Sequence, residues 1–360
     1  MAQIDAFFKL MNDQGASDLH LVAGQQPILR IRGDMERVKY KVFDNDTLKA
    51  MLYEIVSEDK AKLFEETGDV DFGYELPGLA RYRGNLFQQK YGIGAVFREI
   101  PSEILTCDQL SLPTVVKKLA SLPKGMVLVT GPTGSGKSTT LAAIVDEVNK
   151  TRSDHILTIE DPIEFVHKSQ KCVVNHREVG LHTKSFAAAL RGALREDPDI
   201  ILVGEMRDLE TIALAMEAAM TGHLVFGTLH TLNAAKTVDR IIEIFPSSQQ
   251  AQVRSTLADA LKAVISQTLF KRIDKKGRCA ALEILICTPA VRNLIREGKT
   301  YQIPSTMQTG KRYGMQTLDD AILDHLTNGR ISPDAAYSNC IEKGKFVQFL
   351  SKPPTDFTDV

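Results

Sequence analysis

The residues best suited to chemistry in this chain form a glycine-rich loop, GPTGSGKS, at positions 131–138. The fixed positions of the phosphate-binding P-loop motif are occupied by Gly131, Gly136, Lys137 and Ser138. Glycines let backbone N–H groups close around phosphate oxygens, the lysine reaches the β- and γ-phosphates, and the hydroxyl holds Mg²⁺. The loop therefore predicts binding of a nucleoside triphosphate.

The residues on either side of the loop support this interpretation. An apolar run at 126–129 is typical of a buried strand, and residues 138–148 have the periodicity of a helix. The helix N-terminus adds partial positive charge beside the phosphates. A chance glycine turn, the alternative, would not require this context. The predicted nucleotide-binding residues are Gly131, Pro132, Thr133, Gly134, Ser135, Gly136, Lys137, Ser138 and Thr139.

Carboxylates follow two further apolar runs. The stretch ILTIEDPIE delivers Glu160, Asp161 and Glu164, and DIILVGE ends in Glu205. Phosphoryl hydrolysis needs a carboxylate to orient or deprotonate the attacking water, and others to hold hydrated Mg²⁺. We expect Glu164 and Glu205 to be the hydrolytic carboxylates, with Glu160 as a third candidate; which one is the general base stays open. An acidic exit from strand to loop is the alternative.

The DIILVGE run departs from the common form of its motif, which ends the strand in Asp. Gly204 and Glu205 stand there instead. Glu205 would then hold Mg²⁺ through water or act on the nucleophile, and the sequence does not separate these roles. Ser138 and Glu205 are thus the predicted Mg²⁺ residues.

Two histidines flank a third apolar run, LVFGTL, with His223 before it and His230 after it. A histidine at a strand end near a γ-phosphate can sense or stabilise it by hydrogen bonding, although a lone histidine is commonly structural. His20 has no such neighbours and is interpreted as structural.

Apolar strands alternate with helices beyond residue 113, which implies a mainly parallel sheet with helices on both faces. Ligands in such sheets lie at the carboxyl ends of the strands, where the P-loop, Glu160, Glu205 and His230 would cluster. The expected helices lie at 138–148, 185–196, 209–220, 234–244, 249–273, 290–297 and 318–328, and the expected strands at 126–129, 155–160, 200–203, 224–228 and 278–287.

The first hundred residues have the pattern of a smaller α+β domain. Expected here are helices at 4–11 and 47–64 and strands at 19–21, 27–32, 69–75 and 81–98. Three closely set arginines, Arg81, Arg83 and Arg98, would by themselves indicate a solvated strand face. Two prolines and little periodicity place a linker at 101–113.

Composition excludes several classes of protein. The chain has 360 residues, with 44 basic and 45 acidic side chains, so no overall charge favours nucleic acid or anionic lipid. It contains no run of about 18 apolar residues that would span a membrane, and its N-terminus does not resemble a secretory signal. Five scattered cysteines without a CxxC pair argue against disulfides and structural zinc. A reduced cytosolic compartment fits best.

Four motifs together resemble the secretion ATPases of type II secretion and type IV pili: GPTGSGKSTT, TIEDPIE, LREDPDIILVGEMRD and TGHLVFGTLHT. Within that family the chain is similar to the pilus retraction ATPases, which ASDLHL with RYRGNLF, AVRNLIREGKTYQIPSTMQTG and GMQTLDDAI also match. The likeness covers essentially the whole chain. Extension ATPases usually carry a CxxC zinc element and a longer N-terminal region. Neither feature is found in this sequence, which favours retraction.

The resemblance implies an architecture of a homo-hexameric ring. Residues 1–100 would be a PAS-like domain, 101–113 a linker, and 114–360 a RecA-like ATPase domain with a helical C-terminal region. ATP and Mg²⁺ would lie at the domain junction, closed over by the neighbouring subunit's N-terminal domain. Arg83 and Arg98 match arginines that reach the nucleotide, with Arg81 close by.

The resemblance also assigns motifs and partners. Asp161 and Glu164 match the family's acidic motif, His223 and His230 its histidine motif, and 290–297 a motif needed for retraction but not for hydrolysis. The implied function is an ATP-hydrolysing motor for pilus retraction and twitching motility, cytoplasmic and peripheral to the inner membrane at the pilus base. Its implied partners are an inner-membrane platform protein and a paralogous retraction ATPase, with no nucleic acid and no zinc.

Three alternatives stay open. One is a motor for pilus extension or type II secretion. A nucleic-acid motor on a RecA-like core is less favoured, because it would need a basic channel. A non-hydrolysing regulatory ring is disfavoured by the intact set of carboxylates.

Overall fold

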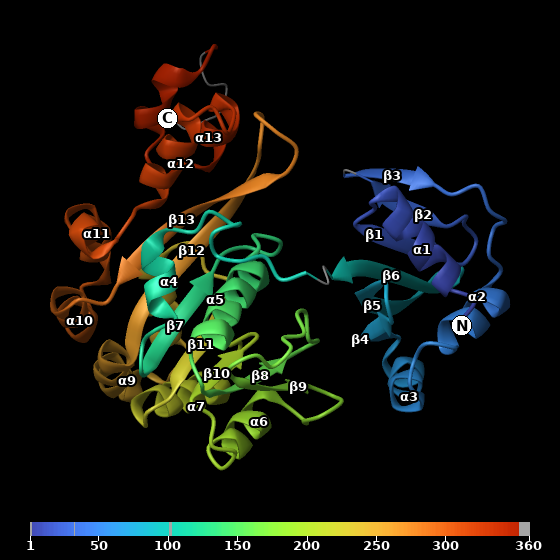
Figure 1. Cartoon of the computed structure of the whole chain (residues 1–360), viewed down its shortest axis with the longest axis horizontal. Helices are drawn as coiled ribbons and strands as arrows, with labels where there is room; N and C mark the ends of the chain where they lie inside the picture. The colour runs from blue at the N-terminus through green and yellow to red at the C-terminus, as the bar shows by residue number, and fades with distance from the viewer. Residues whose placement is uncertain (1, 32, 101–102, 353–360) are drawn as a thin grey trace. The chain divides into compact units, whose positions relative to one another are not determined.

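A computed structural model describes residues 2–31, 33–100 and 103–352 (Figure 1). They form two compact units: Met1–Ile104 with Pro162–Val166, and Leu105–Asp161 with His167–Val360. The division at Ile104 falls inside the predicted linker, of which Pro101 and Ser102 lie outside the described residues. The grouping of Pro162–Val166 with the first unit had no signal in the sequence, because five residues leave no compositional trace.

The first unit is built on a six-stranded antiparallel sheet of order β3-β2-β1-β6-β5-β4. Its elements are α1 (Asp5–Gln14), β1 (Asp18–Val22), β2 (Ile28–Ile31), β3 (Asp34–Arg37), α2 (Asn45–Tyr53), α3 (Glu58–Thr67), β4 (Asp69–Leu76), β5 (Ala80–Gln89) and β6 (Gly92–Ile100). The expected helix at 47–64 is two helices, because Ser57 caps a new one by accepting from Lys60 N–H. The expected strand at 81–98 is the hairpin β5–β6, and the predicted end of β2 at Arg32 lies outside the described residues.

Aromatic side chains form the centre of this unit's core. Phe8 of α1 stacks on Tyr82 of β5 with ring centroids 4.1 Å apart, and its edge meets Phe97 of β6 at 5.0 Å. All three side chains are fully buried. The buried face of α1, which includes Phe7, Phe8 and Met11, therefore covers the sheet. The residues that alternate with Tyr82 along β5 point away from this core.

The second unit has a seven-stranded sheet of order β13-β12-β7-β11-β10-β8-β9, parallel throughout except for β13. Its strands are β7 (Gly125–Thr130), β8 (His155–Glu160), β9 (Val173–Glu178), β10 (Ile200–Val203), β11 (Leu224–Leu229), β12 (Leu261–Lys271) and β13 (Arg278–Ile286). Its helices include α4 (Thr114–Leu119), α5 (Lys137–Thr151), α6 (Phe186–Ala193), α7 (Leu209–Met220), α8 (Ala234–Glu243) and α9 (Ser247–Ala260). The C-terminal region adds α10 (Pro289–Arg296), α11 (Ile303–Thr309), α12 (Leu318–Thr327), α13 (Pro333–Asn339) and α14 (Lys343–Phe346).

Helices cover both faces of this sheet, as the alternating pattern predicts. Along β7, Met126 and Leu128 face a core shared with α6–α9, whereas Val127 and Val129 face a core shared with α4 and α5. All four side chains are fully buried. A strand buried on both faces reads as a continuous apolar run, which is why β7, β8, β10 and β11 were predictable.

The predicted helix at 249–273 is wrong in its second half. Helix α9 ends at Ala260, and the chain continues directly as strand β12 between β7 and β13 (Figure 1). The run LKAVISQTLF is apolar enough for either a buried helix or a buried strand. The β-branched Val264 and Ile265 and a partner strand on each side decide for the strand.

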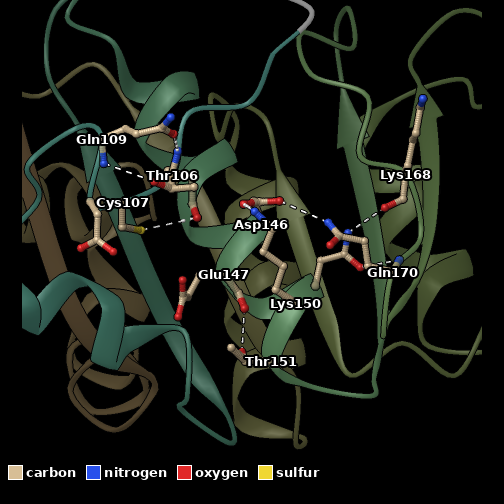
Figure 2. Close-up of polar contacts among 12 residues, drawn as sticks. Thr106, Cys107, Gln109, Asp146, Glu147, Lys150, Thr151, Lys168 and Gln170 are labelled. Atoms are coloured by element: carbon tan, nitrogen blue, oxygen red, sulfur yellow. Dashed lines mark hydrogen bonds and ion pairs between the residues drawn. The ribbon is translucent and has the colours of Figure 1, made fainter.

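Helix α5 contacts two loops, which lie on opposite sides of the helix in Figure 2. The Cys107 thiol donates to the carbonyl oxygen of Ala143 at 3.5 Å. Asn149, fully buried, donates to Lys168 O at 2.8 Å and accepts from Gln170 N–H at 3.0 Å. The loops come soon after Leu105 and His167, the residues at which the chain enters the second unit. Within the described residues, no helix is long and apolar enough to cross a membrane.

Candidate active site

The predicted P-loop connects the end of β7 to the start of α5. Gly136 caps the helix with φ 86°, a left-handed conformation that a side chain would strain. Ser138 lies in the first turn of α5, next to the loop. The strand–loop–helix arrangement expected from the sequence is confirmed.

The Lys137 ammonium lies over the loop. Its Nζ donates to the carbonyl oxygens of Gly131 at 3.0 Å and Pro132 at 3.1 Å. It also lies 3.5 Å from Nδ1 of His230, the residue that follows β11. The structure therefore joins the P-loop lysine to the second predicted histidine.

His230 in turn contacts Glu205, which follows β10. Its Nε2 lies 2.8 Å from Glu205 Oε1. When Nε2 carries the proton and donates to the carboxylate, Nδ1 presents a lone pair to the Lys137 ammonium. Lys137, His230 and Glu205 thus form one polar chain across the carboxyl ends of β7, β11 and β10, as the parallel sheet predicts.

Glu205 is held in its charged form. Burial by itself would raise the pKa of this carboxyl, but Arg207 and His230 outweigh it and lower the pKa below its ordinary value. Arg207 contributes most of this lowering through Nε, 2.5 Å from Glu205 Oε1. At neutral pH the site therefore offers a carboxylate and not a carboxylic acid.

Gly204 brings the predicted carboxylates together. Its N–H donates to Ile159 O at 2.8 Å, which fixes the end of β10 against the end of β8. A Cβ at this position would lie 3.2 Å from the Cα of Glu160 and from Ile159 O. Glycine therefore lets the chain leave β10 toward Glu205 at close approach to Glu160, the last residue of β8, which accounts for Gly204 in this motif.

Glu160 is backed by histidines that sequence reasoning missed. Its Oε1 lies 3.9 Å from Nδ1 of His176 in β9, and that nitrogen is 2.8 Å from Thr158 Oγ1. His176 Nε2 accepts from the His167 N–H at 3.0 Å. Neither histidine belongs to a motif, and β9 itself was not predicted, so the sequence held no signal for them.

His167 is kept neutral by its surroundings. Burial, with a smaller contribution from nearby His176, lowers the pKa of His167 to about 4. Its ring stacks on that of His176 with centroids 6.0 Å apart.

Two predicted residues are not brought to the P-loop within this unit. His223 precedes β11, at the amino end of the sheet, where its carbonyl accepts from Gly125 N–H at 3.0 Å. The length of β11 separates it from the loop by roughly 20 Å, at about 3.3 Å per residue. Asp161 is exposed, at the point where the chain leaves the second unit. Their predicted contributions to nucleotide binding stay predictions.

The three predicted arginines share one face of the β5–β6 hairpin in the first unit. Arg83 and Arg98 are directly opposite each other, and Arg81 lies two residues along on β5. Arg98 Nε lies 2.9 Å from Asp18 Oδ1, whose side chain is 5% exposed. Arg81 contacts Glu75 at 3.8 Å. Like charges directly opposite on paired strands are unfavourable, so neighbouring carboxylates are required to hold this arrangement.

Glu164 belongs to this first unit as well. Its Oε1 lies 3.9 Å from one amino group of the Arg83 guanidinium, whose other amino group lies 3.8 Å from Asp71 Oδ2. The acidic motif is therefore divided: Glu160 ends a strand of the second unit, and Glu164 pairs with a predicted nucleotide-binding arginine.

The chemistry of the donors fits a cation bound together with its substrate. Among residues 2–31, 33–100 and 103–352, no group of three or more His, Cys, Asp or Glu is placed to hold a metal ion. Mg²⁺ usually takes one or two protein oxygens, with phosphate oxygens and water completing its shell. A hydroxyl at Ser138 and a carboxylate at Glu205 are the kinds of ligand that such a site needs.

Comparison with known proteins identifies the class. The family model described as type II/IV secretion system protein matches residues 103–312. The chain belongs to this family, and it is a P-loop ATPase.

Its relatives include pilus motors. The chain is 56% identical over 332 residues to the type IV pilus retraction ATPase PilT of Pseudomonas aeruginosa, covering 92% of this chain and 95% of that protein. It is 54% identical to the twitching motility protein of Neisseria gonorrhoeae, covering 86% and 83%. A crystal structure of the pilus retraction motor PilT with bound ADP matches with a TM-score of 0.87 and 45% identity, over 96% and 98% of the two chains. The predicted fold class, a RecA-like ATPase domain preceded by a smaller α+β domain, is confirmed.

Proposed function

We propose that this protein is the ATP-hydrolysing motor of type IV pilus retraction. The observation that carries the hydrolytic part is the polar chain from Lys137 through His230 to Glu205. The retraction part is supported by similarity to retraction motors over nearly the whole length of both chains.

The ATP site is the P-loop. Backbone N–H groups of residues 131–138 bind the phosphates, and Lys137 transfers its bonds from the loop carbonyls to phosphate oxygens. Mg²⁺, when bound, neutralises the charge that develops on the transferring phosphoryl group. Ser138 would hold it directly and Glu205 through water. The related PilT structure holds bound ADP, which supports nucleotide binding by this chain.

Hydrolysis needs a carboxylate that faces the attacking water. Glu205 suits this role because it is ionised and because His230 fixes one of its oxygens. Glu160 ends the neighbouring strand, and Glu164 is the third candidate. Asp161 and His223 would complete the set from positions outside the Lys137–His230–Glu205 chain.

The arginines complete the site from another subunit. In this proposal residues 1–100 form a PAS-like domain that closes over the nucleotide of a neighbour in a homo-hexameric ring, with 101–113 as the linker to residues 114–360. Arg83 and Arg98 would then stabilise transition-state charge on the phosphates, with Arg81 as support. The pairing of two arginines across the β5–β6 hairpin supports a shared anionic ligand.

The ring converts this chemistry into movement. Contacts to the γ-phosphate and Mg²⁺ close each site, and hydrolysis releases it. The ring acts on an inner-membrane platform protein at the pilus base, from the cytoplasm, and works beside a paralogous retraction ATPase. Residues 290–297, which include most of α10, serve retraction and not hydrolysis.

Steady-state ATPase measurements on the purified chain test the hydrolytic part. Lys137→Ala removes the phosphate contact and Glu205→Gln removes the charge while keeping the shape, so each is expected to lower kcat by at least about a hundredfold. Substantial turnover by Lys137→Ala would overturn the assignment. Full turnover in a variant of the exposed Arg296, with retraction lost, would support the separate role of α10.

A further inference from the structure

Strand β12 places two polar residues against the P-loop. Ser266 pairs in register with Thr130, the last residue of β7, and their hydroxyl oxygens are 2.7 Å apart. Gln267 follows Ser266 and is 3% exposed. A buried glutamine in a buried strand must have hydrogen-bond partners to offset the loss of water.

The Gln267 side chain joins the loop to its helix. Its Nε2 donates to Ser135 O in the loop at 2.5 Å, and its Oε1 accepts from Thr140 Oγ1 in the first turn of α5 at 2.8 Å. A carbonyl on one side and a hydroxyl on the other fix the orientation of the amide, because exchanging its N and O would face oxygen toward the Ser135 carbonyl. Ser135 and Thr140 are themselves buried.

The same residue occupies the space at two P-loop glycines. A Cβ at Gly131 would lie 2.4 Å from the backbone oxygen of Gln267, and one at Gly136 would lie 2.9 Å from its Nε2. Real Cβ atoms do not approach other atoms so closely. The strand backbone behind the loop thus excludes a side chain at Gly131, and the Gln267 amide leaves little room for one at Gly136.

We propose that Gln267 is the positioning residue of the P-loop. It acts through the loop, because its side-chain amide bonds to Ser135 O and Thr140 Oγ1. Its amide holds the loop backbone in the conformation whose N–H groups face the nucleotide, so the loop needs little reorganisation on binding. This inference rests on nucleotide binding at the P-loop and does not depend on pilus retraction.

The first test compares Gln267→Leu with Gln316→Leu. Gln316 is the control, because its Nε2 also donates to a backbone carbonyl, that of Leu282 at 2.9 Å. Leu282 pairs with Gln267 from β13, on the side of β12 opposite to the P-loop strand β7. The measurements are the Kd for ADP, the KM for ATP, kcat, and the Tm of the nucleotide-free chain. Gln267→Leu is expected to raise the Kd and KM about tenfold or more, with a smaller change in kcat, whereas Gln316→Leu lowers Tm to a similar extent and leaves both constants unchanged.

Two results would overturn the proposal: a folded Gln267→Leu chain whose Kd for ADP stays within about twofold of the unchanged chain, or an equal loss of affinity in Gln316→Leu. If Gln267→Leu does not fold, Thr140 decides. Thr140→Val removes the hydroxyl that orients the amide and should weaken ADP binding, and Thr140→Ser should restore it. Equal ADP affinity in the Val and Ser variants would contradict the role. ADP binding is measured without turnover, so a chain that fails to hydrolyse ATP still gives a result.

Discussion

His230 connects the two charged side chains of the candidate active site. It lies between the Lys137 ammonium and the Glu205 carboxylate, at 3.5 Å and 2.8 Å. The sequence marked it as a histidine at a strand end, near a γ-phosphate, and as part of the family's histidine motif. In the structure it links the P-loop lysine to the carboxylate that we propose faces the attacking water.

Replacing His230 with Gln tests this link. Hydrogen bonds to charged groups contribute about 1.5–3 kcal/mol, so kcat is expected to fall roughly 10- to 100-fold while the Kd for ADP changes less. His155→Gln is the control, because His155 begins β8 at the opposite end of the same sheet. An unchanged kcat in His230→Gln, or an equal fall in the control, would contradict the link.

His167 predicts a dependence of stability on pH. Its folded pKa is about 4 against an ordinary value of 6.5, so between these values the unfolded chain binds more protons. This contribution to stability is complete above pH 6.5 and is lost as the pH falls toward 4, by up to about 3 kcal/mol. Urea unfolding at about pH 7, 6 and 5 should show a shallower decline for His167→Gln. Parallel declines for both chains would contradict the buried neutral histidine.

Gly204 connects the site to the strands that carry it. A Cβ there would meet Glu160 Cα and Ile159 O at 3.2 Å, so β8 and β10 must separate by a few tenths of an ångström. Gly204→Ala is expected to cost about 1–3 kcal/mol of unfolding free energy and to lower kcat by displacing Glu205. Gly344→Ala is a suitable control, because its Cβ would meet nothing within 4 Å. Wild-type kcat in Gly204→Ala would show that this close approach does not position Glu205.

Strands could be predicted from the sequence where a local apolar pattern alone decides the secondary structure. The strands β7, β8, β10 and β11 are apolar runs, each followed by residues predicted to act on the nucleotide. Parallel packing alone brings their carboxyl ends together. The prediction failed at β12, because an apolar run of this length fits a helix or a strand until its neighbours are known. Gln267 was missed for the same reason: its role exists only once β12 lies beside β7.

Contacts between side chains that belong to no motif could not be predicted from the sequence either. His176 lies on β9, the edge strand of the sheet, and accepts a hydrogen bond from the His167 N–H. Their spacing along the chain shows no periodicity that would predict this contact. Arg83 and Arg98 could be noted but not paired, because register across a hairpin depends on where it turns.

In the proposed ring, each nucleotide site takes its P-loop from the second unit of one subunit and its arginines from the first unit of a neighbour. If Arg83 acts on a neighbour's nucleotide, then Arg83→Ala and Lys137→Ala chains are each inactive alone. Mixed, they should recover part of the ATPase activity, because some sites then receive an intact loop and an intact arginine from different subunits. Variants carrying both changes in one chain are the control and should gain nothing when mixed with Lys137→Ala. No recovery in the first mixture would place the arginine's action within its own chain.

The central claim is that ATP hydrolysis at Lys137 and Glu205 withdraws pili. The most direct measurement counts and times surface pili in a strain that lacks this gene, complemented with the unchanged chain, Lys137→Ala or Glu205→Gln. Surplus, non-retracting pili are expected with either variant, and normal retraction with the unchanged chain. Cells without pili would indicate an extension motor, and retraction restored by Lys137→Ala would contradict the account.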